Sequence, residues 1–324
     1  MQYSTLAATA STDMQAQVHP LAIAPAIAPA YGALAHLASD NLYFGGHGGC
    51  LYTCPYIHTP CCAPHSAAIF LSACGNNFSV RFPGSDIARV ERAAALSCAP
   101  RSLSAIGVKM IIVHVSPLHP AYRALQGIAR PGLLSLDRER FAALDVQLDL
   151  AFRGALSPFE ASHLYDRILD LAYGALPRPK PADMRAQQWI ATLRLDPHLS
   201  LRKLANESGL SYQHMSRIFG EALGLPLRQF QLWKKLDRVR RVYGDHDNLT
   251  DVAHAAGFSD LAHMTRVFQR NYGAPPSYFF RNPNVRIFGA RPDTRDSSVT
   301  HHKPSAAPAL DRAFRLGSGT TVAC

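Results

Sequence analysis

The spacing of apolar positions changes along the chain. Between residues 41 and 117, short apolar runs (NLYF, AAIFLSA, FSVRF and MIIVHV) alternate with Gly, Pro and Asn. Runs bounded by turn residues in this way predict a small antiparallel β-barrel or sandwich. Between residues 138 and 176, apolar side chains recur at helical spacing and predict two amphipathic helices, marked by Phe141, Leu144, Leu148 and Phe152, then by Leu164, Ile168 and Leu171. An apolar stripe on such helices needs a partner, so we expect them to hold a dimer, with Leu164 and Ile168 in its interface.

The segments that flank these elements lack such periodicity. Residues 1–40 have no basic opening of a signal peptide and contain three prolines, which predicts a flexible leader. Residues 177–182, inside GALPRPKPAD, predict a stiff extended linker because of their prolines. Residues 283–324 are rich in Ser, Pro, Gly and charge, which predicts a disordered tail. The remaining segment, residues 183–282, is then a second domain.

Within residues 183–282 one pattern occurs twice, first as HMSRIF at 214–219 and then as HMTRVF at 263–268. The flanks repeat as well. The first copy predicts a helix capped by Ser200, a turn at Gly209 and a second helix over about 211–223. The second copy predicts the same arrangement, with Thr250 as N-cap, a turn at Gly257 and a second helix over about 260–272. Each copy therefore reads as a helix-turn-helix motif.

In each second helix, the apolar positions should face the core and leave a polar face outside. That outward face can hydrogen-bond to base edges and phosphates. Its residues are Tyr212, Gln213, Ser216 and Arg217 in the first copy, and Asp260, Leu261, His263 and Arg266 in the second. The intervening LRQFQLWKKLDRVRRVY predicts a rigid connecting helix, whose Lys234 and Arg241 are candidate phosphate contacts. Two recognition helices on such a strut could enter successive major grooves, about 34 Å apart.

Charge favours the same interpretation. The chain carries a formal net charge of +10, and residues 183–282 hold 14 Lys and Arg against 9 Asp and Glu. An excess of positive charge is typical of a nucleic-acid partner, although a solvated basic surface is the alternative. A helical solenoid that binds proteins is a further alternative, but solenoids need about three or more repeats and this chain has two.

Three stretches of this region carry a resemblance to a known family. The main one is GFSDLAHMTRVFQRNYGAPPSYF at 257–279, and it is supported by LANESGLSYQHMSRIFGEALG and FQLWKKL. Together they resemble the C-terminal double helix-turn-helix of AraC/XylS-type bacterial transcription regulators. The resemblance covers about a hundred residues. Three positions depart from the family pattern: Ala262 stands where Ser is usual, Met264 where Phe is frequent, and Phe280 where Arg is common. The last change removes one possible contact to a phosphate or carboxylate.

This resemblance implies an α+β protein. The expected parts are a cupin-like β-barrel that senses an unknown small-molecule effector (about 41–117), dimerisation helices (about 138–176) and an all-α DNA-binding domain (183–282). It also implies a cytoplasmic, nucleoid-associated bacterial homodimer without cofactors, bound to double-stranded operator or promoter DNA, with RNA polymerase as a partner if the protein is an activator. Activation and repression are both open. No apolar run approaches the roughly 18 to 20 residues that span a bilayer, so no membrane partner is expected.

A cluster of soft ligands, CLYTCPYIHTPCCAPH, leaves two alternatives open. Its candidate metal ligands are Cys54, Cys61, Cys62 and His65, but no paired C-x2-C spacing is present, which favours inert reduced thiols over a metal or thiol sensor. Relatives of AraC regulators also include DNA-alkylation repair proteins with a methyl-accepting cysteine. Neither Cys54 nor Cys98 lies beside a His, and no catalytic motif occurs, so we do not expect an enzyme.

Overall fold

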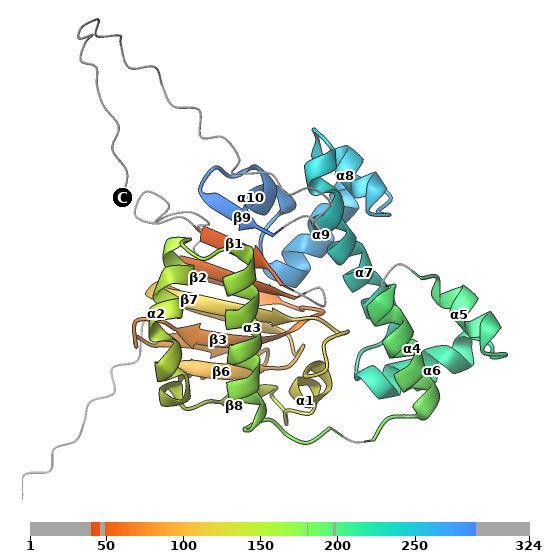
Figure 1. The fold of residues 1–324 in the computed structure, drawn as a ribbon, viewed down its shortest axis with the longest axis horizontal. Coiled ribbons are helices and arrows are strands. Elements are labelled where there is room, and N and C mark those ends of the chain that lie inside the picture. The colour runs from red at the N-terminus through yellow and green to blue at the C-terminus, as the bar shows by residue number, and fades with distance from the viewer. Residues whose placement is uncertain (1–39, 46–48, 180, 197–198, 290–324) are drawn as a thin grey trace, which may run out of the picture. The chain divides into compact units, whose positions relative to one another are not determined.

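A computed structural model describes residues 40–45, 49–179, 181–196 and 199–289. Its first part is a sheet flanked by helices, and its second part is helical (Figure 1), which confirms the expected α+β order. The strands are β1 (Asp40–Phe44), β2 (Cys50–Cys62), β3 (Ala67–Ser72), β4 (Phe78–Arg81), β5 (Arg89–Glu91), β6 (Ala93–Leu96), β7 (Arg101–Val115), β8 (Leu133–Ser135) and β9 (Val285–Phe288).

The strands form one sheet in the order β8-β6-β3-β7-β2-β1-β9, with β4 paired to β7 and β5 to β4. The pairs are antiparallel except for β1 with β9. The longest pair, β2 with β7, contains register shifts between Cys54 and Tyr56 and between Thr59 and Cys62. Such bulges bend a strand and increase its twist, so these two strands can serve both the centre of the sheet and the β4–β5 branch.

Alternation along the strands gives the sheet two apolar faces. In β3, Ile69 and Leu71 belong to one buried cluster, whereas Ala68 and Phe70 belong to the other. Helix α1 (Tyr122–Gln126) lies between β7 and β8 in the chain. The 3-10 helix η2 (Arg138–Leu144), α2 (Asp145–Arg153) and α3 (Pro158–Tyr173) follow β8. Helices α2 and α3 lie across one face of the sheet (Figure 1). Ser157 caps α3 in a capping box with Glu160, which explains why the helix begins there.

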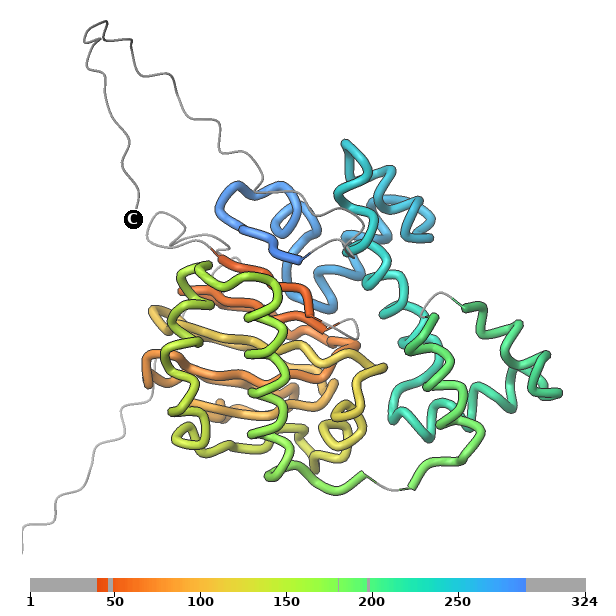
Figure 2. The backbone as a smooth tube through the Cα atoms, viewed as in Figure 1, coloured from red at the N-terminus to blue at the C-terminus, as the bar shows by residue number. Residues whose placement is uncertain are grey.

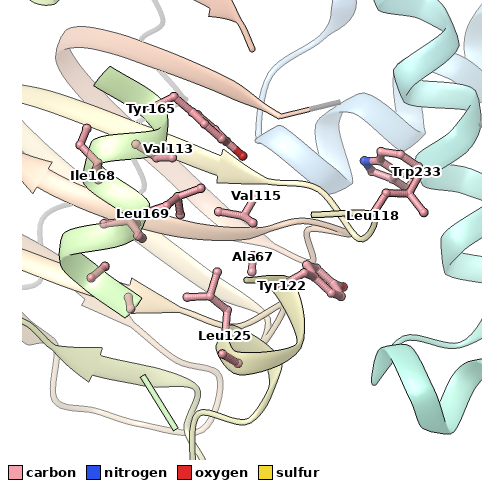
Figure 3. Close-up of a cluster of buried hydrophobic side chains, with 14 of the residues drawn as sticks. Ala67, Val113, Val115, Leu118, Tyr122, Leu125, Tyr165, Ile168, Leu169 and Trp233 are labelled. Carbon is pink, nitrogen blue, oxygen red and sulfur yellow. The ribbon is translucent and has the colours of Figure 1, made fainter. Parts of the chain in front are cut away.

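The helices predicted between 138 and 176 are present, but their apolar stripe is not available for a dimer. Leu164 is 3% exposed and Ile168 is fully buried. Figure 3 shows Ile168 and Leu169 of α3 pointing at Val113 and Val115 of β7. The expectation that Leu164 and Ile168 hold a dimer is therefore wrong, because the sheet of the same chain covers them.

The helical part follows the proline-containing linker. It consists of α4 (Met184–Leu195), α5 (Leu201–Glu207), α6 (Tyr212–Leu223), α7 (Leu227–Val242), the 3-10 turn η3 (Tyr243–Asp245), α8 (Leu249–Ala255), α9 (Leu261–Tyr272) and α10 (Pro276–Arg281). The predicted connecting helix is α7, and its buried residues include Phe230, Trp233 and Leu236. Phe230 contacts both Phe219 and Trp233, so α6 and α7 share one core.

The expected disordered tail begins too early at residue 283. Strand β9 pairs in parallel with β1, from Asp40 with Val285 to Tyr43 with Phe288, and Figure 2 lets the reader follow the chain back to this edge. The ring of Phe288 stacks on Tyr43 at 4.5 Å, and Arg286 donates hydrogen bonds to the Asn41 side chain and the Arg153 carbonyl. Residues 290–324, and the leader except Asp40 in β1, lie outside the described residues.

Candidate nucleic-acid interface and apolar pocket

The first helix-turn-helix motif is built by α5 and α6, as the caps predicted. The Ser200 hydroxyl accepts a hydrogen bond from the Lys203 amide at 3.4 Å, and the Ser211 hydroxyl accepts one from the His214 amide at 3.2 Å. Gly209 in the turn has φ of +63°, a conformation that glycine adopts without strain. The Leu210 amide donates to the Ala205 carbonyl at 3.0 Å and closes the turn.

The second motif is built by α8 and α9, with one cap different from the prediction. Asn248 caps α8 by accepting from the Asp251 amide at 2.9 Å, so the assignment of Thr250 is wrong. Asn is a favoured N-cap, and placing it two residues earlier lengthens the helix by just over half a turn. Asp260 caps α9 by accepting from the His263 amide at 2.6 Å. That hydrogen bond is the main cause that lowers the pKa of Asp260.

The inward and outward faces of α6 agree with the sequence pattern. Met215, Phe219 and Leu223 are at most 1% exposed, whereas Gln213 and Arg217 are exposed and Ser216 is half-buried. Arg217 lies 3.5 Å from Glu221, one turn along the helix. Tyr212 is more constrained, because its hydroxyl accepts from the Gln231 amide at 2.9 Å and the Arg202 guanidinium lies over its ring.

Helix α9 has the same arrangement. Met264 and Phe268 are buried, Arg266 is exposed, and Leu261 and His263 are half-buried. The ring of His263 lies 3.1 Å from the Ser259 hydroxyl and packs edge-on against Phe258. Of the four predicted residues, Asp260 and Arg266 are exposed, and Asp260 is engaged in capping, so Arg266 is the exposed residue whose side chain does not cap the helix.

The two candidate phosphate contacts on α7 make contacts within the chain. The Lys234 ammonium donates to the Leu199 carbonyl at 2.7 Å, and burial lowers its pKa. Arg241 donates to Asp237 at 3.2 Å, and Arg240 donates to the same buried carboxylate at 2.9 Å. The number of charged residues in the sequence could not predict these hydrogen bonds within the chain. Two neighbouring cations on α7, Arg228 and Arg238, are exposed and were not singled out by the sequence.

The C-terminal end of α9 is bound to the sheet. The Ala63 amide donates to the Arg270 carbonyl at 2.7 Å, and the His65 amide donates to the Asn271 side chain at 2.7 Å. Nearby, Tyr278 of α10 and Tyr52 of β2 both donate to the Asp40 carboxylate. Burial raises the pKa of Asp40 above its ordinary value, and the two tyrosines oppose that shift. The helical part and the sheet thus share a polar contact that the linker alone did not suggest.

Between these contacts lies a pocket of about 120 Å³. Most of its lining is apolar, which is typical of small-molecule sites. The sheet contributes Phe44, Tyr52, Ile57, Phe70, Leu103 and Ile112, and the helices contribute Trp233, Leu236, Phe268, Tyr272, Phe279 and Phe280. Polar groups in the lining include Arg101, His114, Asp237 and Arg240. Burial lowers the pKa of His114 to about 4, so this imidazole is neutral at neutral pH.

The cysteine-rich stretch, unassigned as an element by the sequence, is strand β2. Cys54 and Cys62 are buried, Cys61 is exposed, and burial raises the pKa of the Cys54 and Cys62 thiols. His65 is buried, and burial followed by the nearby Arg270 charge lowers its pKa to about 4. Within the described ranges, no group of three or more His, Cys, Asp or Glu side chains is placed to hold a metal ion.

Cys98, the other thiol considered as a nucleophile, lies near the Tyr122 hydroxyl at 3.2 Å and Gln126 at 2.8 Å. Burial raises its pKa, and a raised pKa disfavours the reactive thiolate. Among the helices of the described residues, none has the length and apolar character to cross a membrane.

The match to known proteins falls on the part of the chain that contains the two helix-turn-helix motifs. A family model described as a helix-turn-helix domain matches residues 204–282. The probable transcription factor PqrA of Proteus vulgaris is 29% identical over 109 residues, which are 33% of this chain and 84% of that protein. The multiple antibiotic resistance protein MarA of Escherichia coli is 27% identical over 99 residues, 30% of this chain and 76% of that protein.

Longer relatives are matched over a smaller share. The right origin-binding protein of Escherichia coli is 30% identical over 115 residues, 34% of this chain and 39% of that protein. Among solved structures, ToxT from Vibrio cholerae aligns with a TM-score of 0.44 at 14% identity, covering 75% of this chain and 96% of that one.

Proposed function

We propose that residues 204–282, which match the helix-turn-helix family model, form an AraC-type DNA-binding domain, and that the chain is a sequence-specific transcription regulator that binds double-stranded operator or promoter DNA. The observation that carries the proposal is the duplicated motif itself. Both α6 and α9 begin at a side-chain cap, bury one apolar face and present exposed polar side chains on the other. Two such helices, joined by one connecting helix, could each enter one of two adjacent major grooves of DNA.

We assign different roles to the outward residues. Arg217 of α6 and Arg266 of α9 are exposed and can form bidentate contacts with guanine, while Gln213 can read adenine. Ser216, Leu261 and His263 would contact bases or phosphates beside them. Tyr212 and Asp260 would act mainly by holding the start of each recognition helix, because their polar atoms already bond within the chain.

The pocket is the proposed effector site. It is lined by the sheet and also by α7, α9 and α10, so a bound molecule would touch both the sensing part and the DNA-binding part. A ligand that favours one arrangement of these parts shifts the DNA-binding equilibrium by its difference in affinity for the two arrangements.

We further propose a homodimer that acts in the bacterial cytoplasm at the nucleoid, contacting RNA polymerase if it activates transcription. The dimer surface is reassigned to the exposed face of α2, where Val146 is 71% exposed and Leu150 is 38% exposed. These residues are four apart and lie on one side of the helix. No catalytic role is proposed, since burial raises the pKa of both thiols considered as nucleophiles.

Selection from a pool of random duplexes with the full chain tests the proposal. We expect enrichment of one sequence, bound at least about a thousand-fold more tightly than random duplex at physiological salt. Arg217→Ala combined with Arg266→Ala should reduce that ratio strongly, whereas Arg81→Ala, an exposed cation on the β4 strand, should not. Failure to enrich any sequence, with folded protein and binding to random DNA intact, would refute sequence-specific regulation.

A further inference from the structure

We propose that the pocket binds a small apolar monocarboxylate, with Arg101 of β7 holding the carboxylate. This inference rests on the effector role proposed for the pocket and specifies its ligand class. The charged side chain of Arg101 is placed among the apolar lining residues.

Arg101 is a buried cation for which the described residues supply no counter-charge. Its residue is 5% exposed, and its Nη1 donates to the carbonyls of Ser97 at 2.8 Å and Ala99 at 3.0 Å. Among the described residues, no carboxylate lies within 4.0 Å of the guanidinium. Both hydrogen bonds of this guanidinium to the described residues come from Nη1. Nε and Nη2 are not among the fully buried polar atoms of the described residues that lack a partner, so these two nitrogens keep accessible surface and can donate to a bound molecule.

A buried charge in this situation favours an anion. Burial lowers the pKa of Arg101 to about 10, which still leaves the guanidinium protonated at neutral pH. Removing a charge from water is costly unless it is paired, and two carbonyl oxygens do not supply a negative charge. The planar guanidinium presents donors in a fork that matches the two oxygens of a carboxylate.

The other ionisable groups of the lining do not neutralise Arg101. The carboxylate of Asp237 is already bonded to Arg240 and Arg241. The thiol of Cys62 stays neutral because burial raises its pKa, and burial keeps the His114 imidazole neutral as well. The lining therefore has an excess of positive charge. One negative charge would balance Arg101, whereas a phosphate dianion would leave a second charge buried among apolar groups.

The apolar side chains that line the rest of the pocket determine the size and polarity of the part of the ligand beyond its carboxylate. The guanidinium carbon of Arg101 lies 5.5 Å from the centre of the Phe70 ring, so an anion bonded to it meets aromatic and aliphatic surface at once. A cavity of about 120 Å³ is comparable to one that holds a single benzene molecule. A short alkyl chain or one ring fits this space, and reaching Trp233 or Phe268 would bring it against α7 or α9.

Three unbranched probes of six carbons each, with different head groups, test the inference: hexanoate, hexanamide and hexylamine. Titration calorimetry with the full chain should give hexanoate at least about ten-fold tighter binding than hexanamide, since a charge-assisted hydrogen bond is worth that much. Hexylamine should not bind. Arg101→Gln should reduce hexanoate to the level of hexanamide, and Arg101→Lys should retain part of the preference. Arg92→Gln, which removes an exposed arginine from the same half of the chain, should change nothing.

Equal binding of hexanoate and hexanamide, no binding of either, or a preference that survives Arg101→Gln would overturn the inference. Melting temperatures of each variant show whether a loss reflects unfolding, and Arg101→Lys then supplies the comparison. DNA selection is carried out on the same preparations, with and without hexanoate. Intact DNA selection with failed hexanoate binding would therefore overturn the ligand class alone, whereas failed DNA selection would overturn the proposed function.

Discussion

At the scale of single residues, Arg217 illustrates how a side chain can be accessible and still have a local partner. Its pair with Glu221 is exposed on both sides, at 64% and 67%. An exposed pair at this spacing contributes only about 0.3 to 0.5 kcal/mol, so exchanging Glu221 for a guanine edge costs little. The sequence could identify Arg217 as outward-facing, since helical periodicity alone decides that.

Replacing Arg217 therefore separates base reading from general DNA affinity. Arg217→Ala should lose about 1 to 3 kcal/mol of discrimination on the selected duplex and little on random duplex. Lys234→Ala should weaken both duplexes alike if Lys234 meets a phosphate, and should instead lower the melting temperature if its bond to the Leu199 carbonyl dominates. Equal losses on both duplexes for Arg217→Ala would exclude base reading.

His65 gives a prediction for acid stability. Its folded pKa of about 4 lies below the ordinary 6.5, so the unfolded chain binds more protons between these values. Stability from this group is therefore complete above pH 6.5 and falls as the pH drops toward 4. Denaturant unfolding across this range should show the decline, and His65→Gln should flatten it. An unchanged slope in the variant would contradict the buried, neutral imidazole.

At the scale of elements, the positions of the helices could be predicted from the sequence more accurately than those of the strands. Caps such as Ser211 and turn glycines are local signals, and they located α6 and α9 closely. Strand β2 was not predicted, because Pro55 and Pro60 resemble the residues that interrupt strands and its cysteines resemble metal ligands. Strand β9 pairs with residues about 245 positions away, which no local pattern reveals. An apolar stripe looks the same whether it faces its own sheet or another subunit, which explains the wrong dimer surface.

The reassigned dimer surface makes a direct prediction for α2. Val146→Glu with Leu150→Glu should place two charges in the proposed interface and produce monomers by sedimentation equilibrium. Ile106→Glu is a matched control, because Ile106 of β7 is 63% exposed and lies outside α2. If the unmodified chain is already monomeric at tens of micromolar, the α2 interface does not exist.

Strand β9 should contribute to the stability of the sheet edge. Phe288→Ala removes the ring stacked on Tyr43, and we expect a loss of about 1 to 3 kcal/mol in chemical denaturation, because the ring is only partly buried. Phe159→Ala is the control, since that ring is 72% exposed and should cost under about 0.5 kcal/mol. Equal small effects of both changes would mean that β9 adds nothing to the edge.

At the scale of the whole molecule, one continuous set of contacts links the pocket with helices α6 and α9. Helix α7 contributes Trp233 and Leu236 to the pocket, and Phe230 of the same helix packs against Phe219 of α6. Helix α9 contributes Phe268 and Tyr272 to the pocket, while Arg266 faces outward from it. The family pattern could predict two parts of this kind. It could not predict the role proposed for Arg101, because that role depends on finding no carboxylate within 4.0 Å of its guanidinium among the described residues.

We propose that helices α6 and α9 contact DNA simultaneously, and hydroxyl-radical footprinting on the selected duplex distinguishes two contacts from one. We expect two protected patches per chain, about 10 base pairs apart on one face, with Arg217→Ala weakening one patch and Arg266→Ala the other. A single protected patch that responds to only one of the two variants would contradict simultaneous DNA contact by α6 and α9.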